Sequence, residues 1–308
     1  MIWNPMEGIH LGPLTIRMYS LMFVIAFALG WYIMKRIYEN EKESMEKLDT
    51  LFIWTVLATL LGARLGQVFF YDWEYFRNHK LEILLPFRFE PEFQFTGFAG
   101  LASHGAAIAI IITMYFYSKK IINRPLLWVL DRVVIPVASG AVFVRIGNFF
   151  NSEITGVATN ASNPFAVKFV REYYSPETIM AKTGIPNPDA AYNALVNNPK
   201  FAPLLAQVPY SHPAQLYESF SYIFVFALLF FLYWRTKAAE KHGLIFGVFL
   251  IALWSIRFAV EFVKSKQGGL EDVFGQFTTG QWLSIPFILV GLYFLFMAEK
   301  PLPEDIEL

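Results

Sequence analysis

The sequence contains no cysteine among its 308 residues. Disulfide bonds, thiolate metal ligands and a cysteine nucleophile are therefore excluded within this chain. Charged residues are scarce too, at 16% against about 25% in ordinary soluble domains. The 25 basic and 25 acidic side chains cancel, so the chain offers no general basis for binding nucleic acid, and any basic character must be local.

Apolar and aromatic residues take the place of the missing charges. Hydrophobic residues make up 56% of the chain and aromatic residues 18%, including 32 Phe, 15 Tyr and 8 Trp. This composition is typical of lipid-facing helices with aromatic residues at the membrane interfaces. A helix needs about 20 apolar residues to cross a bilayer. Seven such runs predict an all-α integral membrane protein with spans at 16–37, 51–71, 98–117, 126–150, 216–234, 244–263 and 282–297.

Lysine and arginine gather in three short turns, which predicts the orientation of the chain. The turns lie at 35–47, 119–124 and 235–241, after the first, third and fifth runs. Positively charged turns stay in the cytoplasm, so the N-terminus is expected outside and the C-terminus in the cytoplasm. We therefore expect a single membrane domain over residues 1–308, in which residues 152–211, rich in proline, form an irregular outward-facing cap with short helices.

Polar residues of the apolar runs fall at one predicted depth. The stretch VRIGNFFNSE at the end of the fourth run carries Arg145, Asn148, Asn151 and Glu153. Ionisable side chains are costly in a bilayer and usually face a cavity or one another. The pattern therefore predicts a polar pocket open to the outer leaflet. On this topology the other helices bring to the same outer level Tyr19, Arg64, His104, His212, Gln215, Tyr217, Glu218, Arg257, Glu261 and Gln281.

Each of these residues also has a purely structural interpretation. Arg257 and Glu261 are four residues apart on one helical face, and such a pair often just neutralises itself. Asn148 and Asn151 suit hydrogen bonds between helices, and Arg64 suits a side chain that reaches the outer headgroups. A lone histidine beside glycine is more often a core residue than a catalyst. What favours a site is the coincidence of these residues at one depth on separate helices.

Two arginines in an outer-leaflet pocket suit a phosphate group. The guanidinium fork matches phosphate oxygens, and every surrounding phospholipid carries a phosphate at this depth. Titratable residues at the same level, including His104, Glu153, Glu218 and Glu261, suit proton transfer or the orientation of the arginines. The residues thus predict a site for a phospholipid headgroup. No metal is expected, because the sequence has no H-E-x-x-H motif or other ligand spacing.

Several motifs together resemble the bacterial prolipoprotein diacylglyceryl transferase family. They are GARLG, SHGA, RIGNFFNSE followed by Gly156, HPAQLYE and RFAVEF, in the family's order. The resemblance implies a seven-helix enzyme of the inner membrane that needs no cofactor. Such an enzyme moves the diacylglyceryl group of phosphatidylglycerol to the lipobox cysteine of a preprolipoprotein signal peptide, and releases glycerol phosphate. The nucleophilic sulfur then belongs to the substrate, which agrees with the absence of cysteine here.

The resemblance also implies roles for single residues. Arg145 and Arg257 match the family's essential arginines and are expected to bind the phosphate and stabilise the departing glycerol phosphate. His104 matches the family's histidine and is the candidate general base toward the thiol. Glu261 is expected to orient Arg257. The other implied lipid-binding residues are Tyr19, Arg64, Asn148, Glu153 and Gly156, and the secondary candidates are Asn151, His212, Gln215, Tyr217 and Glu218.

Four positions depart from the family's pattern, and two other classes of protein compete with the enzyme. Ala106 and Ser152 stand where glycine is frequent, and both changes are small. Leu253 stands where a tyrosine is frequent, and Lys264 stands where an arginine is frequent. A transporter or lipid carrier with an outward vestibule would gather the same charged residues, but the paired repeats and broken helices of transporters are not visible. A structural scaffold explains the aromatic content but not the clustering. Cysteine-dependent release of glycerol phosphate distinguishes the enzyme from both.

Overall fold

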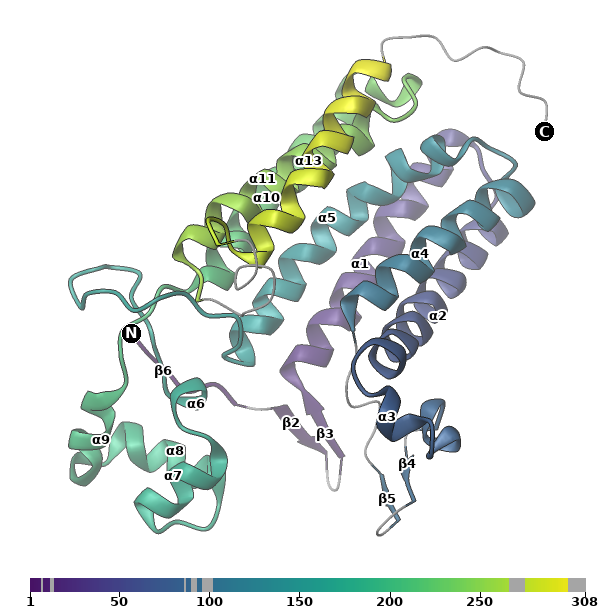
Figure 1. The fold of residues 1–308 in the computed structure, drawn as a ribbon. Coiled ribbons are helices and arrows are strands. Elements are labelled where there is room, and N and C mark those ends of the chain that lie inside the picture. The colour runs from purple at the N-terminus through teal and green to yellow at the C-terminus, as the bar shows by residue number, and fades with distance from the viewer. Residues whose placement is uncertain are drawn as a thin grey trace. The chain divides into compact units, whose positions relative to one another are not determined.

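The computed structural model describes residues 1–6, 8–11, 14–85, 87–89, 93–95, 102–265 and 275–298. This part is mostly helical, and seven of its helices are long and apolar enough to cross a membrane (Figure 1). The chain forms two compact units, which we call unit 1 (Met1–Ile33 with Val133–Leu308) and unit 2 (Met34–Arg132).

The seven predicted spans are confirmed as helices. α5 has the predicted bounds, and residues 98–101 of the third predicted span lie outside the described residues. The helices are α1 (Met18–Glu41), α2 (Met45–Phe70), α4 (Ser103–Tyr117) with the π-turn η2 (Ser118–Ile122), α5 (Leu126–Phe150), α10 (Ala214–Arg235), α11 (Leu244–Val260) with the 3-10 turn η5 (Glu261–Val263), and α13 (Thr279–Met297).

The first two helices are longer than the hydropathy pattern predicts. Only residues 42–44 separate them, so most of the basic turn predicted at 35–47 is helical. Hydropathy detects only the apolar part of a helix, which is about as long as the hydrocarbon layer is thick. Beyond that part, ion pairs between charged side chains on one face can stabilise further helical turns. Lys35 Nζ lies 3.9 Å from Glu39 Oε1 in α1, and Ser44 Oγ caps α2 by accepting a hydrogen bond from the backbone N–H of Lys47.

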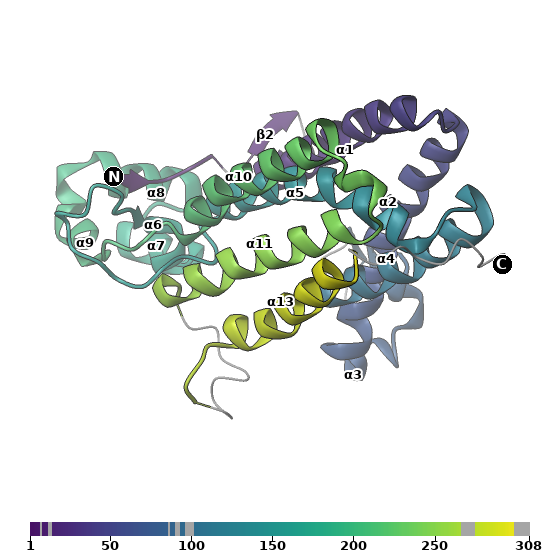
Figure 2. The same ribbon diagram turned by 90° about the horizontal axis from the view of Figure 1, so that it is seen from above.

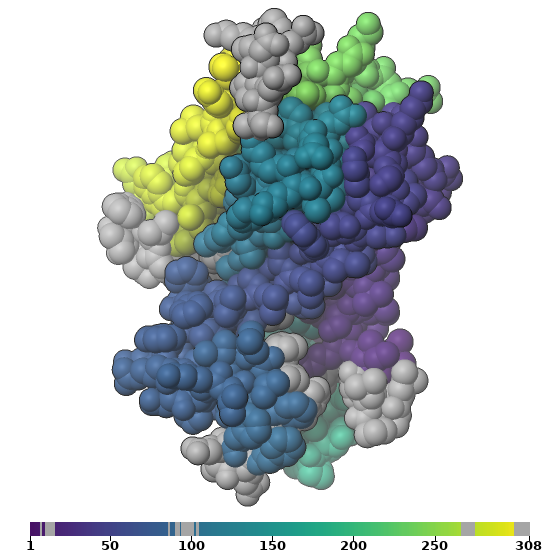
Figure 3. All heavy atoms as spheres, turned by 90° about the vertical axis from the view of Figure 1, so that its right-hand side faces the viewer, coloured from purple at the N-terminus to yellow at the C-terminus, as the bar shows by residue number. Residues whose placement is uncertain are grey.

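In unit 2, α2 packs closely against α4. A Cβ atom added to Gly105 would lie 2.6 Å from the Cα atom of Gly66, so only glycine lets the two backbones approach in this way. Figure 3, which faces α2 and α4, shows their side chains packed against each other. The shorter elements of unit 2 are α3 (Trp73–Phe76), the 3-10 turn η1 (Lys80–Ile83), and the antiparallel strands β4 (Phe87–Arg88) and β5 (Gln94–Phe95).

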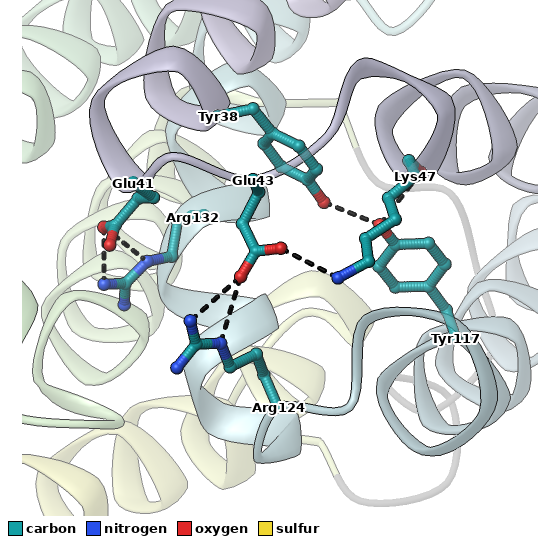
Figure 4. Close-up of polar contacts among 7 residues, drawn as sticks. All are labelled: Tyr38, Glu41, Glu43, Lys47, Tyr117, Arg124 and Arg132. Carbon is teal, nitrogen blue, oxygen red and sulfur yellow. Dashed lines mark hydrogen bonds and ion pairs between the residues drawn. The ribbon is translucent and has the colours of Figure 1, made fainter.

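Polar side chains from separate helices meet at one end of unit 2 (Figure 4). Tyr117 Oη donates to the carbonyl oxygen of Lys47 at 2.9 Å, so its only proton is used, and Tyr38 Oη, 2.8 Å away, donates to it. Glu43 Oε2 accepts from Lys47 Nζ at 2.9 Å, and Glu43 Oε1 accepts from Arg124 Nη2 at 3.0 Å. Glu43 thus joins the start of α2 to the segment that precedes α5.

We expect Glu43→Gln to destabilise the protein by about 1–2 kcal/mol, because the amide loses two charge-assisted hydrogen bonds. Burial opposes ionisation of this carboxyl, but the hydrogen bonds from Lys47 and Arg124 outweigh it and hold the pKa of Glu43 below its usual value of 4.5. A lowered folded-state pKa means that the stabilisation is present above pH 4.5 and is lost as the pH falls below it.

Thermal denaturation of the detergent-solubilised protein at pH 7 and at pH 4 measures this effect. The difference in midpoint between the wild type and Glu43→Gln should shrink at the lower pH. Glu74→Gln, which changes an exposed carboxylate of the same unit, is the control and should leave the midpoint unchanged. An equal difference at both pH values for Glu43→Gln would show that the charge of this residue does not stabilise the fold.

An ion pair between a buried arginine and a partly buried glutamate lies near the same end of unit 2. Arg132 Nη2 and Nε donate to Glu41 Oε1 at 2.8 and 3.2 Å, and the guanidinium carbon lies 4.4 Å from the centre of the Trp128 ring (Figure 4). A buried guanidinium that has both a carboxylate and an aromatic face as partners has a structural role. It joins α1 to α5 within the unit.

In unit 1, α10, α11 and α13 lie side by side (Figures 1 and 2). The rings of Trp254 on α11 and Phe287 on α13 stack with centres 4.2 Å apart. Ser219 Oγ on α10 donates to the carbonyl oxygen of Val142 on α5 at 3.1 Å. The 3-10 turn η4 (Ala238–Glu240) joins α10 to α11. These contacts bring the ends of α5, α10 and α11 together.

The short helices predicted between the fourth and fifth spans are present in unit 1. They surround a small core of their own that includes Ile179, Tyr192 and Leu195. The elements are β6 (Lys168–Phe169), α6 (Val170–Tyr173), α7 (Pro176–Thr183), α8 (Pro188–Asn197), the 3-10 turn η3 (Pro199–Phe201) and α9 (Ala202–Gln207). Before α1, β1 (Ile2–Trp3) pairs in parallel with β6, and β2 (Gly8–Leu11) pairs with β3 (Leu14–Arg17) as a hairpin.

Candidate functional site

A chain of hydrogen bonds organises the end of α5 and the turn that follows it. Arg145 Nη1 donates to Asn148 Oδ1 at 3.0 Å, and Asn148 Nδ2 donates to Glu153 Oε1 at 2.6 Å. Arg145 and Asn148 are three residues apart in α5, so their side chains leave the same face. Glu153 returns to this face because its backbone N–H donates to the carbonyl oxygen of Asn148 at 3.1 Å. Three residues of the RIGNFFNSE motif therefore form one network.

Helix α10 supplies the carboxylate that faces Arg145. Glu218 Oε2 pairs with Arg145 Nε, and the two side chains are only 2% and 12% exposed. Gln215, one turn earlier, donates from Nε2 to the backbone carbonyl of Glu153. Glu218 Oε1 and the amide oxygen Oε1 of Gln215 are buried and have no hydrogen-bond partner among the described residues. Glu218 and Gln215 thus hold Arg145 and the Glu153 turn in one orientation.

Tyr19 joins the network from α1. Its ring packs on Gly147, where an added Cβ atom would lie 2.9 Å from Tyr19 Cδ2. Its hydroxyl group forms a hydrogen bond with Asn148. The glycine of the RIGN motif therefore leaves the space that the tyrosine ring occupies, and Asn148 contacts three side chains of the network.

The backbone from Ser152 to Gly156 has an unusual conformation. Ser152 and Ile154 have φ angles of 54° and 59°, in the left-handed region. This costs about 1–2 kcal/mol per residue outside glycine, and strain of this kind gathers at functional sites. Gly156 follows at a point where no side chain fits, because an added Cβ atom would lie 2.6 Å from the carbonyl oxygen of His212.

Arg257, in the last turns of α11, has no carboxylate partner among the described residues. Its Nε atom is buried without a hydrogen-bond partner there, and its guanidinium carbon lies 5.5 Å from the centre of the Trp254 ring. Burying part of a guanidinium group without an anion is costly, more so inside a membrane. This side chain is therefore suited to receive an anion from outside the chain.

The expected pairing of Arg257 with Glu261 is not formed. Glu261 Oε1 accepts from Lys264 Nζ at 2.5 Å, and Glu261 Oε2 accepts from Thr278 Oγ1 at 2.8 Å. The physical reason is local. α11 ends at Val260 and continues as the 3-10 turn η5, in which residues three apart face the same way, so Glu261 meets Lys264. Residues four apart share a face only while the helix remains α-helical, and α11 stops before Glu261.

Tyr222 is a site residue that the sequence interpretation missed. It is 2% exposed and lies one turn after Glu218 on α10. Its hydroxyl group forms a hydrogen bond with Arg145 and interacts electrostatically with Arg257 and Glu218. Tyr222 is therefore a common neighbour of both arginines. The four-residue spacing from Glu218 is the signal that points to it.

Three secondary candidates lie outside this network. His212 Nδ1 lies 3.0 Å from Tyr217 Oη and 3.5 Å from Asn163 Nδ2, so His212 and Tyr217 form a small group of their own. Asn151 is exposed. Its backbone N–H donates a hydrogen bond to the carbonyl oxygen of Gly147 at 3.0 Å. These residues border the Arg145 network through the backbone.

Arg64 and His104 belong to unit 2. Arg64 is buried and does not extend towards headgroups, because its Nε and Nη2 donate to the carbonyl oxygens of Ile83 and Glu82 at 2.9 and 2.6 Å. It therefore fixes η1 to α2. His104 lies in the first turn of α4, and its side chain is outside the described part of the structure.

The arrangement in unit 1 is suited to an anion with several oxygens. Glu218 balances the charge of Arg145, whereas Arg257 leaves positive charge beside it, and guanidinium groups bind phosphate oxygens in pairs. Within the described ranges, no group of three His, Asp or Glu side chains is placed to hold a metal ion. The residues that the structure brings together are Tyr19, Arg145, Asn148, Glu153, Gln215, Glu218, Tyr222 and Arg257.

Comparison with known proteins agrees with the family resemblance. The sequence profile of the family described as prolipoprotein diacylglyceryl transferase matches residues 7–297. Three similar relatives each carry the name phosphatidylglycerol–prolipoprotein diacylglyceryl transferase. The relative from Chloroherpeton thalassium is 34% identical over 94% of this chain and 91% of its own. The relative from Bacteroides fragilis is 33% identical over 97% and 95%, and that from Tolumonas auensis is 32% identical over 95% of each chain.

Proposed function

We propose a function from one premise: the chain belongs to the prolipoprotein diacylglyceryl transferase family. The protein is a transferase that moves the diacylglyceryl group of phosphatidylglycerol to the thiol of a lipobox cysteine in a preprolipoprotein. A carbon–sulfur bond forms, and the bond between the diacylglyceryl carbon and the phosphate oxygen breaks. Glycerol phosphate leaves with the electron pair. The observation that carries the proposal is Arg257, a partly buried cation that shares the neighbour Tyr222 with Arg145 and has no carboxylate partner among the described residues.

The proposed setting is the bacterial cytoplasmic membrane. The chain forms one membrane domain over residues 1–308, with the N-terminus outside, the C-terminus in the cytoplasm and residues 152–211 as an outward-facing cap. The basic turns at 119–124 and 235–241 support this orientation. In it, the ends of α5, α10 and α11 that carry Arg145, Glu218 and Arg257 lie at the level of the outer leaflet, where phosphatidylglycerol enters sideways.

Arg145 and Arg257 bind the phosphate of the lipid. Negative charge grows on the phosphate oxygen as its bond to carbon breaks, so hydrogen bonds from the two guanidinium groups strengthen towards the transition state. Glu218, Asn148 and Tyr222 hold Arg145 before substrate binds. The donors then need little reorganisation during the reaction, which is the physical basis of their contribution.

The thiol proton goes to His104, the candidate general base that the family resemblance supplies. The remaining residues support the lipid site. Tyr19 and Glu153 hold Asn148, and Gly156 keeps the turn close to its neighbours. In the described contacts, Arg64 holds η1, and Glu261 holds Lys264 and Thr278, which gives these two residues positioning roles.

The decisive experiment mixes the purified protein with phosphatidylglycerol and a lipobox peptide. Mass spectrometry should detect the thioether product, and glycerol phosphate should appear in equal amount. The same peptide with Cys→Ser is the control and should give neither product. Absence of the thioether with the cysteine peptide would overturn the proposal, and transport of labelled lipid in proteoliposomes would then favour a carrier.

We expect His104→Ala to slow the transfer by about 10²–10⁴-fold, the usual contribution of a positioned general base. The rate of the variant should recover as the pH rises, because hydroxide then deprotonates the thiol directly. Measuring the transfer rate against pH for both proteins checks this expectation. Full activity of His104→Ala at neutral pH would remove His104 from the role of base.

A further inference from the structure

A second site lies beside the signature turn, outside the seven spans. A cleft of about 370 Å³ opens next to Thr155 and Gly156, and we call it the Thr155 cleft. This volume falls in the range of small-ligand pockets, about 300–1,000 Å³. Its lining residues are Thr155, Gly156, Ala158, Phe169, Glu172, Tyr173, Val208, Pro209, Ser211 and Ser265.

The floor of the Thr155 cleft is rigid because three extended segments pair beneath it. The backbone N–H of Gly156 donates to the carbonyl oxygen of His212 at 2.8 Å, and that of Ser265 donates to the carbonyl oxygen of Thr155 at 3.1 Å. The segment after Glu153 is thus bonded on both sides, by residues 210–212 and by residues 263–265. A ligand on this floor meets a preformed surface.

The lining of the Thr155 cleft combines polar and apolar side chains, and it includes no Lys or Arg among the described residues. Thr155 and Ser211 are buried in the floor, and Glu172 and Tyr173 lie exposed on the rim. Thr155 Oγ1 donates to Glu172 Oε1, and burial of this carboxyl end raises the pKa of Glu172, although the hydrogen bond partly offsets the rise. Hydroxyl groups, a carboxylate and an aromatic ring suit peptide groups and a cationic side chain, and they do not suit a lipid phosphate.

The position of the cleft relates it to the transfer site. Thr155 lies two residues after Glu153, and an extended chain covers roughly 3.3–3.6 Å per residue. If the acceptor cysteine of the substrate lies at the Arg145 network, the neighbouring residues of the substrate therefore lie at the Thr155 cleft. In the proposed function the acceptor cysteine belongs to a signal peptide, and the apolar region of a signal peptide precedes its processing site. The segment after the cysteine therefore lies beyond the apolar region, towards the outward-facing turn.

We infer that the Thr155 cleft binds the polypeptide segment that follows the acceptor cysteine, and that Glu172 favours a basic residue in that segment. The inference rests on the proposed function and adds a site for the protein substrate that is separate from the phosphate site. It implies that the choice among acceptor proteins depends on residues 155–173, while the affinity for lipid depends on the arginines.

Binding of fluorescent acceptor peptides tests the inference without turnover. The two probes carry Cys→Ser and differ in one residue, Lys or Glu at the second position after the serine. The wild type should bind the lysine probe about three- to fivefold more tightly, the size of a partly exposed charge pair. Glu172→Gln should abolish this preference while keeping the shape of the side chain, and Glu172→Lys should invert it. Glu177→Lys makes the same charge change at an exposed position of α7 outside the cleft and should keep the wild-type preference.

The cysteine forms of the same peptides then report on transfer. In Glu172→Lys the KM for the peptide should change and the KM for phosphatidylglycerol should stay the same. Equal binding of both probes by the wild type, or an unchanged preference in Glu172→Lys, would overturn the inference even if transfer is normal. A charge preference that follows Glu172 while no thioether forms would support the cleft and reject the proposed function.

Discussion

Arg257→Gln is expected to lower kcat/KM for diacylglyceryl transfer by about 10²–10³-fold, the usual cost of removing one donor that stabilises transition-state charge. The reason is the electrostatic asymmetry of the site. Glu218 already compensates Arg145, whereas Arg257 has no carboxylate partner in the described structure and so supplies the excess positive charge that a phosphate needs. Arg257→Lys keeps the positive charge but lacks the planar guanidinium fork. The decrease in kcat/KM should therefore be smaller than for Arg257→Gln.

Transfer rates with phosphatidylglycerol and a lipobox peptide measure this effect. The matched control is Arg235→Gln, which removes an exposed arginine at the other end of α10. Arg235→Gln should have the kcat/KM of the wild type. Its thermal denaturation midpoint should equal that of Arg257→Gln. Wild-type activity in Arg257→Gln would show that this cation does not contact the lipid phosphate.

Gly156→Ala is expected to destabilise the protein by about 1–3 kcal/mol and to abolish most of the transfer activity. A Cβ atom at this position would lie 2.5 Å from the carbonyl oxygen of Val263 and 2.6 Å from that of His212. Both obstacles are backbone atoms, so the extended segments must separate. Glu153, three residues away, would then lose its position against Asn148, and Arg145 would lose a support.

The thermal denaturation midpoint and the transfer rate together check this expectation. Gly30→Ala is the matched control, because a Cβ atom there would make only an ordinary contact at 3.6 Å with Pro136. That change should be neutral or stabilising, by up to about 1 kcal/mol, since alanine favours a helix over glycine. If Gly156→Ala behaved like Gly30→Ala, the close approach at the signature turn would have no importance for stability or activity.

Some contacts followed from the residues alone because they are local. Arg145 and Asn148 lie three residues apart in one helix, so their meeting needs only helical geometry. The same rule failed for Arg257 and Glu261, where the helix tightens to a 3-10 turn and Lys264 becomes the nearer partner. Spacing predicts which side chains share a face, but it does not decide between partners when the helix changes its geometry.

The sequence by itself determined the seven helices and the motif that identifies the family. Hydropathy over about 20 residues is a local property, and the order of the motifs is read directly from the chain. Only the tertiary structure decided that Glu218 pairs with Arg145, 73 residues earlier in the numbering, that Tyr222 interacts electrostatically with both arginines, and that Arg257 remains without a carboxylate partner among the described residues. These outcomes depend on how separate helices are rotated and packed against each other, and no local pattern encodes that rotation.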